Sequence, residues 1–188
     1  PLLSNCQSIE GVSSVGLCLW IRDTKTPIVD FISDLDTAKV HRKGKRNRTI
    51  DCSWKENRHR CKTAKRMYDV RAFVGEVGDT RRTAIFAHPY PSKGNLIIRY
   101  PKRARGETMM VSYGNALRGV RMTQGSPVEW RVFVDDELLY ETQVTIDDFN
   151  WNTIELRVPS GEETCEYRFE IKAEDSSWRH FFFDGAVF

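Results

Sequence analysis

The chain has 188 residues, of which 40% are hydrophobic and 11% aromatic, and its formal net charge is +3. This is enough apolar side chain for one sandwich with an extension, or for two small domains, and it argues against a wholly disordered chain. No apolar run approaches the roughly 18 residues of a membrane-spanning helix, so we identify no transmembrane segment of that kind in the sequence.

The first 67 residues predict an extension ahead of the main domain. They begin with Pro1 rather than Met, which indicates processing or a longer parent protein. Thr26 and Pro27 are typical of a helix start, and apolar residues recur at helical spacing from Ile28 to Leu35. We therefore predict one short amphipathic helix within residues 27–39.

A strongly basic stretch follows. Residues 39–66 contain twelve Lys or Arg against Asp51 and Glu56, a local charge of +10, so the remainder of the chain carries −7. The stretch has few apolar residues, which predicts an exposed loop or hairpin. Such a charge attracts polyanions, namely nucleic acid, acidic polysaccharide or anionic lipid headgroups. The residues assigned to polyanion binding are Arg42, Lys43, Lys45, Arg46 and Arg48. Only Trp54 is interleaved and no nucleic-acid-binding motif is present, which argues against nucleic acid. A solvated loop without a ligand is the alternative, and both stay open.

Five cysteines stand at positions 6, 18, 52, 61 and 165. Cys52 and Cys61 flank the eight residues Ser53–Arg60, most of them polar or charged, a spacing that suits a disulfide across a hairpin or loop in an oxidising compartment. Together with His59 and His41 they could instead hold zinc, although no Cys-x-x-Cys pair is present. The odd count leaves at least one thiol among Cys6, Cys18 and Cys165 free or paired with another chain.

From residue 68 onward, short strands follow one another at roughly ten-residue spacing, separated by turn residues such as Gly78-Asp79 and Pro159-Ser160-Gly161. The predicted strands are Val70–Val77, Thr83–His88, Asn95–Tyr100, Glu107–Tyr113, Leu117–Met122, Val128–Asp135, Leu138–Val144, Trp151–Val158, Glu166–Ala173 and Arg179–Phe188. This pattern predicts an all-β fold, an antiparallel β-sandwich of the jelly-roll type, over residues 68–188.

Two segments predict the core of this sandwich. Residues 166–173 alternate charged and apolar side chains, as a strand with one buried face requires. Residues 178–188 are too apolar for an edge strand and predict a central one. Trp130 stands in phase with Val128, Val132 and Val134, so it is predicted to be a core residue.

The segment Val128-Glu129-Trp130-Arg131-Val132-Phe133-Val134-Asp135-Asp136-Glu137-Leu138, with the closing Phe181-Phe182-Phe183-Asp184-Gly185-Ala186-Val187, resembles the hairpin and last strands of galactose-binding-like jelly rolls. Carbohydrate-binding modules have this fold. The resemblance covers about residues 68–188.

The resemblance implies two kinds of site. One is a sugar-binding platform of exposed aromatic rings, for which the candidates are Trp54, Tyr90, Tyr113, Trp151 and Trp178. Trp151, between Asn150 and Asn152, is the ring most expected to be exposed. The other is a structural calcium, for which Asp184 matches an aspartate of the closing strand. Ordinary packing of the rings, and a salt bridge or capped turn at Asp184, are the alternatives.

No catalytic motif is present. Asp135-Asp136 and Asp147-Asp148 fall in predicted turns, and His88 and His180 are isolated histidines of the kind that are usually structural. The sequence therefore predicts a non-catalytic periplasmic or extracellular module that binds a glycan or an acidic surface polymer, as part of a larger protein. A structural or protein-interaction sandwich without a small ligand, or a carbohydrate-active hydrolase, are the alternatives.

Overall fold

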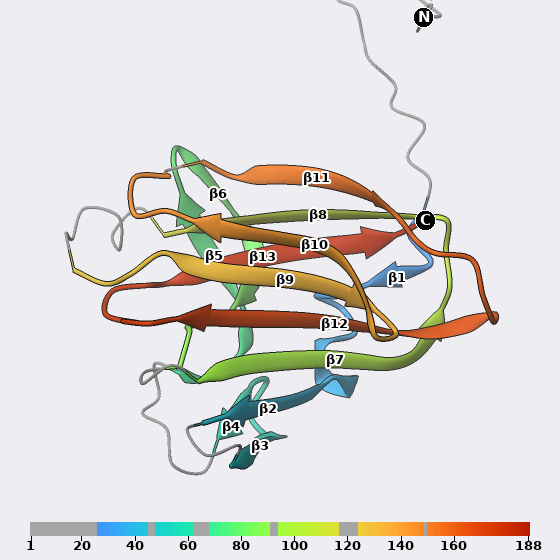
Figure 1. Cartoon of the computed structure of the whole chain (residues 1–188), viewed down its shortest axis with the longest axis horizontal. Coiled ribbons are helices and arrows are strands. Elements are labelled where there is room, and N and C mark those ends of the chain that lie inside the picture. Colours follow the sequence, from blue (N-terminus) through green and yellow to red (C-terminus); the bar gives the residue numbers. More distant parts are fainter. Residues whose placement is uncertain (1–25, 45–47, 62–67, 91–93, 117–123, 149) are drawn as a thin grey trace, which may run out of the picture.

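The computed structural model describes residues 26–188 except 45–47, 62–67, 91–93, 117–123 and 149. These residues form two antiparallel sheets stacked as a sandwich, with a single turn of 3-10 helix at Leu35–Thr37 (Figure 1). The prediction of an all-β chain is confirmed.

The first sheet has the strand order β11-β8-β13-β6-β5, and a short β1 pairs with β13. Its strands are β1 (Val29–Asp30), β5 (Arg71–Val77), β6 (Thr80–Phe86), β8 (Thr108–Asn115), β11 (Asn152–Arg157) and β13 (Phe181–Val187). The closing strand β13 lies between β8 and β6, so the prediction that it is central is confirmed.

The second sheet has the strand order β10-β9-β12-β7-β2-β3-β4. Its strands are β2 (Lys39–Lys43), β3 (Thr49–Trp54), β4 (His59–Cys61), β7 (Asn95–Ala104), β9 (Val128–Val134), β10 (Glu137–Val144) and β12 (Thr164–Ala173). Strands β2 to β4 belong to the predicted extension at residues 1–67, and they continue the sheet of the main domain through the pairing of β2 with β7.

Nine of the ten predicted strands are found at their predicted places, within a few residues at each end. The tenth, at residues 117–122, lies outside the described residues.

The core lies between the sheets and is rich in aromatic rings. Trp130 on β9 is fully buried, as predicted, and its ring stacks against Phe169 of β12 at 6.4 Å between centroids. Phe183 of the opposite sheet reaches across to Phe169 at 4.8 Å. The alternation seen in residues 166–173 thus places one face of β12 in the core, where each ring also gains edge and face contacts with its neighbours.

The predicted helix in residues 27–39 is wrong. The backbone N–H groups of Ile28 and Phe31 donate to carbonyl groups of β13 instead of forming helical bonds. The Asp30 carboxylate accepts hydrogen bonds from the N–H groups of Ile32 and Ser33, which fixes a turn. The apolar spacing that predicted the helix has another explanation, because Phe31 and Leu35 enter the sandwich core from a turn rather than from one face of a helix.

The β5–β6 hairpin runs steeply across the long strands in Figure 1. Val77 lies against Gly114 of β8, and the Phe182 ring lies against Gly75 of β5, both in places where a Cβ atom on the glycine would clash. The hairpin thereby covers a small second core of five residues, which are Val77, Ala84, Phe86, Ala116 and Phe182. This explains how β13 can be apolar on both faces.

The two ends of the closing strand β13 mark two opposite ends of the sandwich. At its start, the carbonyl of His180 accepts a hydrogen bond from Ala116, and at its end the carbonyl of Val187 accepts one from Ile28. Residues 26–28 and Phe188 therefore lie together at one end of the sandwich, as Figure 1 shows for the C-terminus and the entering blue strand.

Candidate functional site

Cys52 and Cys61 form a disulfide, as predicted. They are directly opposite one another on β3 and β4, so the bridge closes this hairpin across its ladder. The zinc alternative is thereby removed, because bonded sulfurs are not thiolate ligands. Cys165 is a buried free thiol, and Cys6 and Cys18 lie outside the described residues.

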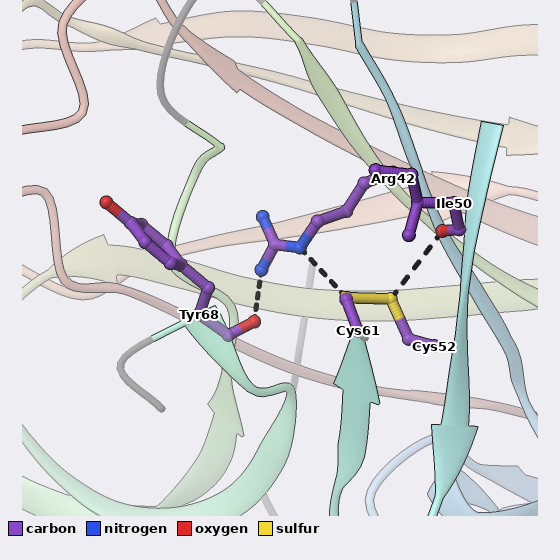
Figure 2. The surroundings of a disulfide bond; sticks show 5 residues. All are labelled: Arg42, Ile50, Cys52, Cys61 and Tyr68. Atoms are coloured by element: carbon purple, nitrogen blue, oxygen red, sulfur yellow. Dashed lines mark hydrogen bonds between the residues drawn. A yellow bond between two sulfur atoms is a disulfide. The ribbon is translucent and has the colours of Figure 1, made fainter. Parts of the chain in front are cut away.

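Arg42 lies beside this disulfide and is fully buried (Figure 2). It follows Val40 in the inward-facing phase of β2, so the pairing of β2 with β7 carries it under the sheet. The expectation that Arg42 is exposed with the other basic residues is therefore wrong. Its Nε donates to Cys61 Sγ at 3.0 Å and its Nη2 donates to the Tyr68 carbonyl oxygen.

The remaining nitrogen of Arg42, Nη1, is buried and has no hydrogen-bond partner within the described part of the chain. The guanidinium instead packs near the rings of Tyr68 and Tyr90, with Cζ 5.4 and 4.9 Å from their centroids. Burial lowers the pKa of Arg42 to about 10, so the group stays charged at neutral pH. No described carboxylate lies within ion-pair distance of it, which leaves a buried donor with unused capacity.

A second buried group lies at His88, two positions after the last residue of β6. It offers a hydrogen-bond acceptor, whereas Arg42 offers a donor. It is 1% exposed, and its Nδ1 donates to the Pro89 carbonyl oxygen at 2.8 Å. Burial lowers the pKa of His88 to about 4, so the ring is neutral and Nε2 carries a lone pair. That Nε2 is also buried without a partner among the described residues.

Six rings, with His88 among them, gather at this place beside Arg42. We call this cluster the aromatic end: Tyr68, Phe86, His88, Tyr90, Trp178 and His180. The His88 ring meets Tyr68 edge-on at 5.0 Å and His180 at 5.5 Å. Tyr68 and Tyr90 are only partly buried and form the outer side of the cluster. Trp178 adopts a left-handed backbone conformation, with φ 60°, and its indole N–H donates to Gln124.

Of the five predicted platform rings, the structure brings together two, Tyr90 and Trp178, at the aromatic end. Tyr113 is 5% exposed and packs on Trp130 at 4.4 Å, so it is a core residue and presents no face to a sugar. Trp151 is partly buried rather than exposed, because the hairpin of β5 and β6 covers it and the Arg82 guanidinium lies 3.7 Å from its ring centroid.

Trp54 lies elsewhere, on β3, and is 38% exposed. It borders an open groove of about 380 Å³ in the second sheet. The groove is lined by Ala38, Lys39, Val40, His41, Asp51, Cys52, Trp54, His59 and Arg99. Of the residues predicted to bind polyanions, Lys43 and Arg48 are exposed, and Lys45 and Arg46 lie outside the described residues.

Asp184 does not fit a calcium site. Its Oδ2 lies 3.0 Å from Arg82 Nε, and a cation held there would face the guanidinium. Burial raises the pKa of Asp184 even beside Arg82, which also disfavours a charged metal ligand. The described residues hold no group of three or more His, Cys, Asp or Glu arranged for a metal. The salt bridge explains this aspartate.

The turn carboxylates have structural partners. Asp135 accepts hydrogen bonds from Arg105 and from the N–H of Glu166, and Asp136 pairs with Arg168 at 2.7 Å. Asp148 accepts from the N–H of Asn150 and from Asn152 Nδ2. These contacts fix the predicted turns. No helix in the described part of the chain is long and apolar enough to cross a membrane.

The sequence did not single out Arg42, Tyr68 and His88 as one site, because they come from three separate segments. One signal was available in the segment Lys39–Lys43. Side chains of a strand point alternately to its two faces, so Arg42 lies on the same face as Val40. An arginine on the apolar phase of a strand indicates a buried polar group with a special role.

No protein-family model matches the chain, and no curated protein sequence matches it. Among solved structures it is similar to the CBM51-2 and INT domains of Clostridium perfringens ZmpB (18% identity, 62% of this chain and 26% of that one, TM-score 0.43). It is also similar to CBM51 of Clostridium perfringens GH95 in complex with methyl-galactose (9%, 79% and 80%, 0.40) and to a family 6 carbohydrate-binding module (8%, 63% and 80%, 0.36).

The resemblance to carbohydrate-binding modules that the sequence indicated is thus found again among these structures. The chain spans about a quarter of the length of the first of them.

Proposed function

We propose that the chain is a non-catalytic glycan-binding module whose sugar site is the aromatic end. The observation that carries the proposal is a pair of buried polar atoms without a partner among the described residues, Arg42 Nη1 and His88 Nε2. The Arg42 guanidinium and the His88 ring both lie beside the Tyr68 ring. Leaving such atoms unpaired costs about 1–3 kcal/mol each, so each calls for a partner beyond those that the described residues supply.

A sugar supplies the complementary groups. Each hydroxyl can accept a hydrogen bond from Arg42 and donate one to His88, while the carbon face of a pyranose packs on an aromatic ring. Both atoms are covered, so a hydroxyl reaches them when the Tyr68 or Tyr90 side chain turns aside. Both of these rings are partly exposed, as are Trp178 and His180.

The disulfide favours an oxidising compartment, which supports a periplasmic or extracellular location for this module. Its role as part of a larger protein remains as predicted from the sequence.

The test is a glycan array followed by titration calorimetry with the monosaccharide that gives the strongest signal. His88→Phe removes the acceptor but keeps a ring, and we expect it to weaken binding by roughly fivefold to a hundredfold. Tyr90→Ala removes one ring and should weaken binding as well.

Trp151→Phe, on the far side of the β5–β6 hairpin, is the matched control and should bind as the parent does. An array without signal would favour the structural or protein-interaction alternative. Equal affinity of the parent and His88→Phe would place the sugar elsewhere on the molecule.

A further inference from the structure

The outer face of the second sheet carries a row of like charges. Lys39 on β2 stands directly opposite Arg99 on β7, and Arg99 stands directly opposite Arg168 on β12. Four positions along, Lys43 on β2 and Lys172 on β12 stand opposite Asn95 of β7 from its two sides. Like charges at directly opposed positions destabilise a sheet, so this arrangement calls for a compensating partner.

Part of the charge is compensated within the chain. Arg99 lies 3.3 Å from Glu166, Arg168 lies 2.7 Å from Asp136, and Lys172 lies 2.9 Å from Glu129. The positive charges on β2 are not compensated in this way. Lys39 and Lys43 are exposed, and no carboxylate among the described residues lies within 4.0 Å of either amine. Positive charge is therefore left over on the β2 side.

The electrostatic potential in the groove beside Trp54 is positive as well. His41 lines this groove opposite Asp51, and its pKa is lowered by burial and by the charge of Arg99, with smaller effects of Lys43 and Arg168 in the same direction. Asp51 acts in the opposite direction and more weakly than Arg99. The groove thus presents a positive field next to an exposed indole ring.

From these observations we infer that the groove lined by Lys39, His41, Trp54 and Arg99, with Lys43 beside it, binds a linear polysaccharide that bears carboxylate or sulfate groups. Trp54 offers a face for one sugar ring, and the lysines offer the charge. The groove, at about 380 Å³, is within the usual size of ligand sites. Single-stranded nucleic acid is disfavoured, because its binding sites stack successive bases on several aromatic rings and this groove has one exposed indole.

This site is separate from the aromatic end, and it differs from the set Arg42 to Arg48 that the sequence predicted, because only Lys43 is shared. Titration calorimetry with oligogalacturonate, which bears carboxylates, and with heparin fragments, which bear sulfates, tests the inference. The ligand that binds more tightly identifies the preferred anionic group. The double variant Lys39→Gln/Lys43→Gln should weaken binding at least tenfold at low salt and flatten the slope of log Kd against log salt by about one to two. Trp54→Ala should also weaken binding, with thermal melts to show that both variants are folded.

The control variant Lys102→Gln/Arg157→Gln removes two exposed cations outside the groove and should bind as the parent does. His88→Phe should keep this binding, so failure at the aromatic end and failure here are distinguishable. Binding that the Lys39/Lys43 double variant leaves unchanged would overturn the inference. So would a neutral oligogalactan that binds equally well, or a single-stranded DNA oligonucleotide that binds more tightly and loses affinity in the same variants.

Discussion

The neutral imidazole of His88 makes the stability of the protein depend on pH. A histidine in an unfolded chain has a pKa of about 6.5, whereas burial lowers the pKa of His88 to about 4 in the folded protein. The unfolded chain therefore binds the proton first, and the free energy of unfolding should fall as the pH drops from about 6.5 to about 4. The loss from this group is on the order of 3 kcal/mol at most.

Urea denaturation at about pH 7 and about pH 5 measures this loss, and His88→Phe isolates it. The variant should lose less stability than the parent over the same interval. Asp184 acts with the opposite sign, because its pKa is raised, but its contribution is common to both proteins and cancels in the comparison. An equal pH dependence in parent and variant would mean that His88 is not buried as described.

Gly75 is a second residue at which the addition of one atom should change the stability of the protein. A Cβ atom there would lie 2.6 Å from the Phe182 ring, which is 3% exposed and has little room to shift. Gly75→Ala should therefore destabilise the protein by about 1–3 kcal/mol. Gly44→Ala is the matched control, because among the described residues its Cβ would meet nothing closer than the Arg48 carbonyl oxygen at 3.8 Å. Thermal melts that rank the two variants equally would contradict the packing of β5 over β13.

Among the elements, the β3–β4 hairpin depends on its disulfide. The bridge joins residues nine positions apart at the edge of the second sheet. Cys52→Ser/Cys61→Ser should lower the free energy of unfolding by about 2–3 kcal/mol, because a short loop is no longer closed in the unfolded chain. Urea denaturation checks this, with the free thiol variant Cys165→Ala as a comparison that leaves the hairpin closed. An unchanged denaturation midpoint would show that the hairpin unfolds independently of the sandwich.

The closing strand gives the sharpest test of the core. Phe183→Ala should cost roughly 3–5 kcal/mol, because the ring is fully buried between the sheets. Phe73→Ala on β5 removes the same ring from a site that is 48% exposed and should cost clearly less. Similar costs for the two substitutions would exclude a central position for β13.

The elements that the sequence predicted best are those whose pattern has one explanation. Strict alternation in residues 166–173 and the apolar run at 181–187 fit only strands. The predicted helix failed because its apolar spacing also suits a turn that inserts Phe31 and Leu35 into a core formed elsewhere. What decided between the two was the pairing with β13, a contact between residues more than 150 positions apart, which local sequence does not encode.

At the scale of the whole molecule, the candidate site is harder to predict than the fold for the same reason. Tyr90 and Trp178 could be proposed from the sequence as aromatic residues near turns. Their convergence at the aromatic end required β2 to add to β7 and the start of β13 to lie beside the end of β6. Trp151 and Tyr113 had the same local appearance, and only the covering hairpin and the position of the second sheet distinguish them.

The direction of β13, with residues 26–28 and Phe188 together at its far end, has a practical consequence for presenting the protein on a solid support. A tether placed after Phe188 points the aromatic end away from the support, about one strand length of 20 Å or more from the attachment point. Protein captured through a C-terminal biotin should therefore bind both kinds of saccharide on a biosensor chip. Random amine coupling consumes Lys39 and Lys43, so it should silence the anionic ligand while sparing the neutral sugar. Equal losses of both responses would show that the two sites are not chemically separable.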